Sequence, residues 1–456
     1  MGILGVVPGI LLLGIVIFVH ELGHFLAAKW RGVTVLKFSL GMGPEMIGFS
    51  RGGTRYCLSW IPLGGFVQMA GDHLEEDGSM PAGGPENFLT HPWFGRVIIA
   101  VAGPAANLVT CFAVLVLTFR VGVQQPDWPN VLGPLPDSTV AYAAGLREGD
   151  RFTRFDGHAL TTWHELESAA RDLEKHPSSK MELSRDGHAY AVELPSERMK
   201  RVLGDLQPPP PPPLVGAVGT GMPAYRAGVK EGDRVLSVDG APVRSFGEIA
   251  RALRGRADQP IVFELERDGR SFPLTITPMR VDGTGEGALI GIEAQRGMEW
   301  TERLSVTEAV PAAFRGTGRM IGDVYGSLWL TISRPAYYRE SIGGPIFIGQ
   351  MARDSARRGL DRWLYLMALI NVAIMAFNLL PVPLLDGGHI TLAVLEGLRR
   401  RAVSGRTYMN FQKVGLVLVG TLFVFILSKD LMRPFQRLRA IDQAPRETTT
   451  VAPSQR

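Results

Sequence analysis

Residues 10–28 read ILLLGIVIFVHELGHFLAA, an apolar stretch that carries three polar side chains, His20, Glu21 and His24. About 20 apolar residues in a helix cross the ~30 Å hydrocarbon core of a bilayer, so this stretch predicts a transmembrane helix over residues 1–30. A cleaved signal peptide is the alternative, and it fits poorly because the segment lacks a basic N-terminal region. Polar residues are costly inside a membrane, and those kept there are usually functional.

The rest of the chain adds three apolar segments and a large polar region. Its 456 residues are 46 % hydrophobic with a mean hydropathy of +0.10, which fits a few membrane spans joined to soluble domains. Further transmembrane helices are predicted over residues 94–120, 361–390 and 409–429. The net charge is +4, and no basic run is interleaved with aromatic residues, so nucleic acid is not an expected partner. Membrane lipid is an expected partner.

The polar region between the second and third spans contains an internal repeat with an offset of 83 residues. The clearest matches are residues 148–151 with 231–234 (both EGDR) and residues 156–157 with 239–240 (both Asp-Gly). Short strands, small helices and Asp-Gly turns alternate in each copy, which predicts two α+β domains over residues 126–204 and 214–282. Residues 205–213, with six consecutive prolines, are predicted to be a semi-rigid linker.

The stretch His20-Glu21-Leu-Gly-His24 has the pattern H-E-x-x-H. Two histidines four residues apart on a helix project from nearly the same face and can bind one metal ion, with the glutamate beside them. Zinc held by three protein ligands keeps a fourth position for water, whose proton Glu21 can accept during peptide hydrolysis. A purely structural pairing of these polar side chains between helices is the alternative.

A third metal ligand has to come from another part of the chain. Residues 378–389 read NLLPVPLLDGGH, and the prolines break the third apolar segment, so that side chains there can turn toward a cavity. Asp386 is the predicted third ligand, with a turn-capping role as its alternative. Asn378 is expected to donate to the developing oxyanion or to hold a substrate strand. His389 is a weaker ligand candidate.

Three motifs on three predicted spans resemble the site-2 protease family of intramembrane zinc metalloproteases: HELGH at 20–24, GPAAN at 103–107 and NLLPVPLLDGGH at 378–389. The resemblance implies roles for six side chains: Glu21 as the catalytic residue, His20, His24 and Asp386 as zinc ligands, and Asn378 and Asn107 as substrate-positioning residues. The repeated domains resemble PDZ domains of bacterial envelope proteases, which capture extended peptide ends by strand addition. Spacer domains without a ligand are the alternative.

The resemblance implies a multi-span α-helical membrane protein with four transmembrane helices, two inserted α+β PDZ domains and a small membrane-edge β region. Residues 31–93 would form that β region, where an unwound substrate adds as a strand. Residues 300–345 are predicted to be amphipathic and interfacial, with a fifth span as the alternative. Residues 437–456 are predicted to be a disordered tail.

In function, the resemblance implies regulated intramembrane proteolysis of single-span membrane proteins, such as an anti-sigma factor or remnant signal peptides. An upstream periplasmic protease that trims the substrate would be a partner, and the PDZ pair would obstruct untrimmed ectodomains. The location would be the cell inner membrane, with the PDZ domains extracytoplasmic. Four arginines in residues 399–406 place that loop in the cytoplasm, but the tail after the last span is also basic, so charge alone leaves the orientation open.

Two other classes of function remain as alternatives. A non-catalytic membrane scaffold would use the PDZ domains to bind exposed protein ends, but it would have no need of a general base. A metal transporter would use the same intramembrane ligands, but it would carry more polar residues along several spans.

Overall fold

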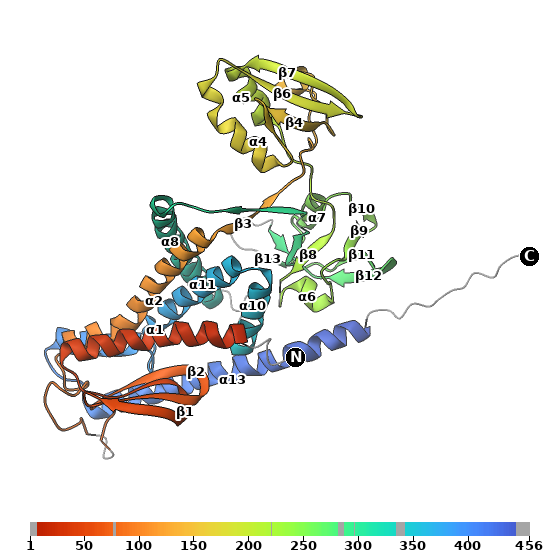
Figure 1. The fold of residues 1–456 in the computed structure, drawn as a ribbon. Coiled ribbons are helices and arrows are strands. Elements are labelled where there is room, and N and C mark those ends of the chain that lie inside the picture. Colours follow the sequence, from red (N-terminus) through yellow and green to blue (C-terminus); the bar gives the residue numbers. More distant parts are fainter. Residues whose placement is uncertain are drawn as a thin grey trace, which may run out of the picture. The chain divides into compact units, whose positions relative to one another are not determined.

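The computed structural model describes residues 7–75, 79–219, 221–280, 287–295, 297–333 and 343–443. The chain divides into two compact units, whose elements are labelled in Figure 1. We call the first the helical unit, formed by Met1–Val123 and Arg303–Met432. The second, the repeat unit, contains Gln124–Glu302 together with Arg433–Arg456.

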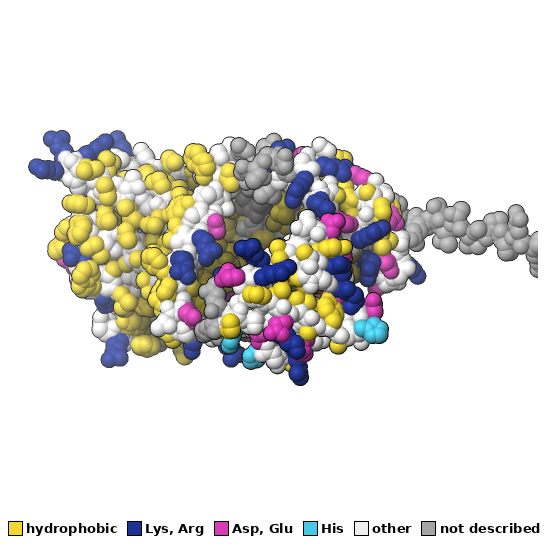
Figure 2. Space-filling model, turned by 90° about the horizontal axis from the view of Figure 1, so that it is seen from above, with side chains coloured by type: hydrophobic (Ala, Val, Ile, Leu, Met, Phe, Trp, Pro, Cys, Tyr) yellow, Lys and Arg dark blue, Asp and Glu magenta, His cyan; other side chains and the backbone are white. Residues whose placement is uncertain are grey.

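Four helices of the described chain are long and apolar enough to cross a membrane. They are α1 (Val7–Arg31), α2 (Trp93–Val121), α11 (Leu360–Asn378) and, within α13 (Gly405–Gln443), the part Gly405–Ser428. Each coincides with a predicted span, although its ends differ. On the face shown in Figure 2, hydrophobic side chains gather over the left part, whereas Lys, Arg, Asp and Glu side chains intersperse over the right part.

Glycines allow α1 and α2 to approach closely. A Cβ atom built on Gly23 of α1 would lie 2.3 Å from the carbonyl oxygen of Ala102, and one built on Gly103 of α2 would lie 2.3 Å from His24 Nε2. Helices come this close only where one partner has no side chain. Gly103, which belongs to the GPAAN motif, thereby leaves room for the imidazole of His24.

The long segment after the repeat unit forms α8 (Val306–Ser333) and α10 (Pro345–Arg358). One side of α8 packs Ala313 and Met320 into a buried cluster with Leu115 of α2, while Phe314 and Trp329 are exposed. α8 is not among the helices that qualify as spans in the described part of the chain. Residues 334–342 of the predicted interfacial segment lie outside the described residues.

The predicted third span over residues 361–390 is not one continuous helix. α11 ends at Asn378, and a separate helix, α12, begins at Asp386 and ends at Arg399. Prolines in the intervening segment cannot donate backbone hydrogen bonds, which stops the helix. The segment folds back tightly, because a Cβ atom on Gly387 would lie 2.0 Å from the carbonyl oxygen of Leu380.

The predicted disordered tail over residues 437–456 starts too early. α13 continues to Gln443, so residues 437–443 are helical. Residues 444–456 lie outside the described residues.

The predicted β region over residues 31–93 contains two strands, β1 (Val35–Arg51) and β2 (Thr54–Met69). Residues 35–40 have partners in both residues 55–58 and residues 65–69, and residues 45–51 pair with 54–59. Among the described strands, residues 65–69 have partners on one side only, which makes them an edge strand. Edge strands carry free backbone N–H and C=O groups that can pair with another chain.

The repeat unit contains two modules with the same strand order, β5-β4-β6-β7 in the first and β10-β9-β11-β12 in the second. The first module comprises α3 (Val140–Ala143), β4 (Arg151–Phe155), β5 (His158–Ala159), α4 (Trp163–Ala169), a 3-10 helix (Ala170–Lys175), β6 (Ser178–Arg185), β7 (His188–Pro195) and α5 (Ser196–Asp205). The second comprises β8 (Val215–Val218), α6 (Pro223–Ala227), β9 (Arg234–Val238), β10 (Ala241–Pro242), α7 (Phe246–Leu253), β11 (Ile261–Arg267), β12 (Arg270–Ile276), β13 (Met279–Arg280), β14 (Ala288–Leu289) and β15 (Ile292–Ala294). β3 (Val123–Asp127) and β16 (Met298–Glu302) form a two-stranded sheet.

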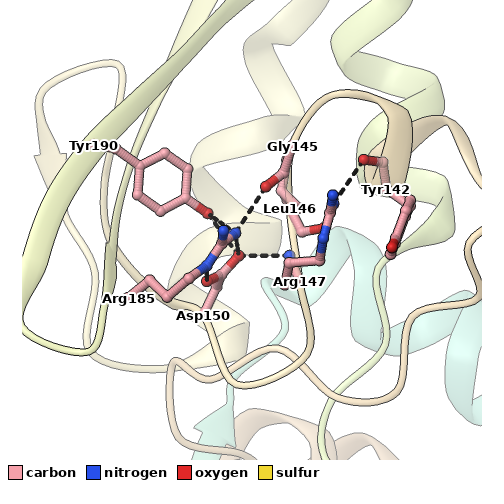
Figure 3. A network of polar contacts seen from close by, with 7 residues as sticks. All are labelled: Tyr142, Gly145, Leu146, Arg147, Asp150, Arg185 and Tyr190. Atoms are coloured by element: carbon pink, nitrogen blue, oxygen red, sulfur yellow. Dashed lines mark hydrogen bonds and ion pairs between the residues drawn. The ribbon is translucent and has the colours of Figure 1, made fainter.

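In each module, the aspartate of the EGDR sequence is buried and accepts hydrogen bonds from an arginine. In the first, Arg185 donates to both carboxylate oxygens of Asp150, at 2.7 and 2.8 Å, and the Tyr190 hydroxyl donates at 2.6 Å (Figure 3). In the second, Arg267 donates to Asp233 at 2.6 Å to each oxygen. Both aspartates are completely buried.

The modules differ at their C-terminal ends. In the first, α5 buries Met199 and Val202 in the module core, and the carboxylate of Asp205 accepts from the N–H of Ala141 at 3.0 Å. In the second, the matching N–H of Ala224 donates to the carbonyl oxygen of Ile290 at 2.9 Å. A helix in the first module therefore occupies the place that an extended segment takes in the second.

Candidate metal centre

Three side chains that are far apart in the sequence converge between α1 and the start of α12. His20 Nε2 and His24 Nε2 lie 3.2 Å apart. Asp386 completes the triangle, with Oδ2 at 3.2 Å from His20 Nε2 and Oδ1 at 3.3 Å from His24 Nε2. Both histidines are buried, at 6 % and 8 % exposure. These three form the cluster of possible metal ligands found in the described residues.

The spacing of the three ligand side chains fits a zinc ion. Zinc bonds nitrogen and oxygen ligands at 2.0–2.2 Å, so ligand atoms at the corners of a tetrahedron lie about 3.3 to 3.6 Å from one another. The two imidazole nitrogens are 3.2 Å apart, and each lies 3.2 or 3.3 Å from a different oxygen of the Asp386 carboxylate, which is close to that value. Two imidazoles and one carboxylate also form a donor set that zinc takes in catalytic sites.

Backbone and side-chain partners from α2 orient both imidazoles. His24 Nδ1 lies 2.8 Å from the carbonyl oxygen of Ile99, which can only accept, so Nδ1 carries the proton and a neutral ring has its lone pair on Nε2. Asn107 Nδ2 lies 3.2 Å from His20 Nδ1, whereas Asn107 Oδ1 is buried without a hydrogen-bond partner. Turning the amide over, which exchanges two atoms of the same shape, lets Oδ1 accept from Nδ1–H and places the lone pair of His20 on Nε2. Such outer partners fix the tautomers of metal-binding histidines.

The carboxylate of Asp386 lacks the donors that a buried anion needs. Its Oδ2 atom is buried without a hydrogen-bond partner. The short distance to His20 Nε2 is therefore a contact between two acceptors, provided that the imidazole is neutral. Acceptor atoms crowded together repel one another unless a cation lies between them. The donor set, its spacing and this orphaned oxygen together fit a bound zinc ion.

Glu21 lies beside the cluster and faces a cavity of about 500 Å³. The cavity is also lined by His20, His24, Asp386 and the edge-strand residues Gly65, Phe66, Val67 and Met69. A Cβ atom on Gly65 would lie 3.3 Å from Glu21 Cγ. The β region therefore contacts the glutamate directly.

The other predicted site residues take different places. Asn378, the last residue of α11, has Nδ2 at 3.3 Å from His20 Nε2, so it borders the three-ligand cluster. Asn107 is fully buried behind His20 and is absent from the cavity lining in the described residues, which favours orientation of the imidazole over contact with substrate. His389 lines the cavity but is not part of the three-residue ligand group.

Comparison with known proteins settles the family, because the sequence model of peptidase family M50 matches residues 8–422. The chain belongs to this family. M50 is the site-2 protease family whose three motifs the sequence carries. The match spans both the helical unit and the repeat unit.

Relatives of this M50 peptidase share its length. It is 31 % identical over 439 residues, 91 % of this chain and 95 % of the relative, to a Xylella fastidiosa protein named "Putative zinc metalloprotease". A Brucella suis protein of similar name is 29 % identical over 447 residues, 93 % and 94 % of the two chains. The regulator of sigma E protease of Salmonella typhi is 29 % identical over 453 residues, 93 % and 97 %. The chain is thus a zinc metalloendopeptidase with membrane-spanning helices.

Sequence reasoning missed part of the site's surroundings. The buried pair of Arg96 in α2 and Glu396 in α12, whose side chains form a direct ion pair, was not predicted. Glu396 lies near the arginines at 399–401, and Arg96 precedes the uncharged apolar run that defines the second span, so no local pattern links the two. The close approach of Gly65 to Glu21 was also missed, because the pairing of an irregular hairpin cannot be read from alternation of side chains.

Proposed function

We propose that this M50 peptidase cleaves single-span membrane proteins inside the bilayer, with His20, His24 and Asp386 holding zinc and Glu21 acting as general base and acid. One observation carries the proposal: the glutamate, the three-ligand cluster and a free strand edge border one cavity. Such a site can bind an extended peptide and hydrolyse it at the same place.

Zinc held by these residues supplies a Lewis acid and lowers the pKa of water toward ~7. Glu21 takes a proton from the attacking water as its oxygen bonds to the carbonyl carbon, and returns the proton to the amine as the C–N bond breaks. Asn378 donates from Nδ2 to the oxygen that becomes negative. Asn107 keeps His20 in the tautomer that binds metal.

The substrate is proposed to enter as an unwound strand beside residues 65–69. A transmembrane helix hides its peptide bonds in internal hydrogen bonds, so it has to unwind before any carbonyl carbon is accessible. Pairing with the edge strand replaces the hydrogen bonds that unwinding breaks. The close approach of Gly65 to Glu21 supports this arrangement, because a peptide paired there runs past the glutamate.

The two modules are proposed to be extracytoplasmic PDZ domains of an inner-membrane enzyme, and to admit only substrates already trimmed by a periplasmic protease. Anti-sigma factors and remnant signal peptides are the proposed substrate classes. Peptide capture is assigned to the second module, because strand addition needs an extended segment such as β15. In the first module, α5 and the carboxylate of Asp205 lie at the corresponding position and disfavour a peptide with a terminal carboxylate.

The experiment compares the cleavage of two tagged single-span reporters, one with an intact extracytoplasmic domain and one already trimmed. The full-length enzyme should cleave only the trimmed reporter. Deletion of residues 126–282 should permit cleavage of both reporters, and deletion of residues 126–204 alone tests the smaller role given to the first module.

Unchanged selectivity after deletion of both modules would contradict the filter. If the full-length enzyme binds zinc but cleaves neither reporter, the proposed substrate class is contradicted.

A further inference from the structure

α2 contributes no ligand to the metal cluster, yet it contacts each part that does. Its Ile99 carbonyl accepts from His24, and its Asn107 contacts His20. Its Arg96 contacts α12, the helix that begins with Asp386. Residues 96, 99, 103 and 107 follow at three- and four-residue steps, so they lie along one face of α2 over about 16 Å.

Arg96 and Glu396 form a buried ion pair between α2 and α12. Their exposed fractions are 8 % and 9 %, and Arg96 Nη2 donates to Glu396 Oε2. The other oxygen of Glu396 accepts from the N–H of Val403 at 3.0 Å. Glu396 therefore fastens the far end of α12 both to α2 and to the turn that follows α12.

Helix stability does not account for the position of Arg96. The residue lies in the first turn of α2, where the helix dipole disfavours a positive charge. Burial of a guanidinium is also costly unless it is paired. Its favourable interaction is with Glu396, and the neighbouring contact is tight, because a Cβ atom on Gly397 would lie 2.6 Å from the Trp93 ring.

The position of Asp386 depends on how α12 is docked. Asp386 is the one proposed ligand outside α1, and the segment between α11 and α12 is not helical. α12 is a regular helix of 14 residues, so a shift at Glu396 moves Asp386 with it. A shift of a few tenths of an ångström matters, because ligand atoms around zinc tolerate only about 0.2 Å.

We propose that the Arg96–Glu396 ion pair is a positioning device for the metal site, which sets the distance of Asp386 from His20 and His24. The inference rests on the proposed zinc site and adds two residues that touch neither metal nor substrate. α2 is in this view the common reference for all three ligands: it fixes the two imidazoles by direct contact and the carboxylate through α12.

The test measures how fast full-length enzyme in detergent loses zinc to a chelator, and records the visible spectrum after cobalt replaces zinc. Arg96→Ala and Glu396→Ala should each release zinc about 10- to 100-fold faster, the range for lost outer partners of metal ligands. The cobalt bands should shift, because the carboxylate is misplaced. The double variant should release zinc no faster than the worse single variant, since both changes remove one interaction.

Two further variants sharpen the test. Arg96→Lys keeps the charge and should restore most of the zinc retention. Arg120→Ala changes the same residue type at the opposite end of α2, where it donates to the carbonyl oxygen of Leu304, and should behave as wild type. If Arg96→Ala does not fold, Glu396→Gln, which keeps the shape and removes the charge, replaces it and should also accelerate zinc release.

The proposal would be overturned if the variants unfold at a lower temperature but release zinc at the wild-type rate and show an unchanged cobalt spectrum. The ion pair would then stabilise only the fold. Failure of the wild-type protein to bind zinc would instead contradict the proposed function.

Discussion

Aspartates in the helical unit and in the repeat unit have opposite surroundings. Asp150 and Asp233 in the repeat unit are completely buried, and arginine and backbone donors satisfy them. Asp386 in the helical unit faces two imidazoles and has an oxygen without a hydrogen-bond partner. A buried carboxylate supplied with donors stabilises a fold, whereas one that faces other acceptors needs a cation.

The largest expected effect comes from removing the charge of Asp386. The Asp386→Asn variant should lose zinc and cleave a single-span reporter at least about 100-fold more slowly, because loss of an outer partner alone costs 10- to 100-fold. Zinc per chain and initial cleavage rate are the measurements. Asp150→Asn, the same change in the repeat unit, is the matched control and should keep its zinc. Normal zinc content in Asp386→Asn would remove the difference between the two regions.

A smaller effect is expected on stability when Asp150 is replaced. Asp150→Ala should destabilise the first module by about 2–4 kcal/mol, at or below the 3–5 kcal/mol typical of broken buried pairs. The expected loss of stability is smaller than for a fully buried pair, because the side chain of Arg185 is 41 % exposed and can be hydrated once Asp150 is removed. Hydrogen exchange of β6 amides in the full-length protein measures the loss. Unaltered exchange in β6 would show that the network is dispensable.

The two modules also differ in the hydroxyl group of Tyr190. Phe272 stands at the matching position of the second module, with Arg267 over its ring at 5.0 Å. Tyr190→Phe therefore converts the first network into the second, and should cost about 1 kcal/mol, the net value of one hydrogen bond. The same exchange measurement applies. A loss as large as that of Asp150→Ala would mean that the arginine alone cannot satisfy the aspartate.

The smallest effect concerns pH. Burial alone would raise the pKa of Asp150, but hydrogen bonds from Arg185, Tyr190 and the N–H of Arg147 lower it below its ordinary value. Burial raises the pKa of Tyr190 to about 12, so its hydroxyl remains a donor. A lowered carboxyl pKa contributes stability that is present above the ordinary value, about 3.9, and lost as the pH falls through the folded value.

Protection of the first module against proteolysis should therefore be the same at pH 7 and pH 5 and should decrease only below about pH 4. A decrease between pH 7 and pH 5 would mean that another group controls its stability.

Much of the helical unit could be predicted from sequence because its signals are local. A run of apolar residues defines each span, and four-residue spacing puts His20 and His24 on one helix face. The end of α11 was less well predicted. Pro381 and Pro383 indicate that the helix breaks, but they do not indicate how long the non-helical segment is. The proline break and the family resemblance both indicated Asp386 as the third ligand, but its convergence with α1 depends on packing between distant segments.

The repeat unit shows the same limit. The offset of 83 residues predicted two similar modules, but the burial of the aspartates in the EGDR sequences was not predicted. The replacement of an extended segment by α5 was not predicted, because the sequence similarity ends before that element. Pairing of Arg96 with Glu396, 300 residues apart, was likewise invisible, since no local pattern links them.

The most direct measurement compares wild type with Glu21→Gln, recording bound zinc and cleavage of a trimmed single-span reporter in the same preparation. Because Glu21 is not a metal ligand in this account, both proteins should bind about one zinc ion per chain. Only the wild type should cleave the reporter, since Glu21 transfers the proton. Cleavage by Glu21→Gln at the wild-type rate would contradict the account, because the proton would then move without this carboxylate.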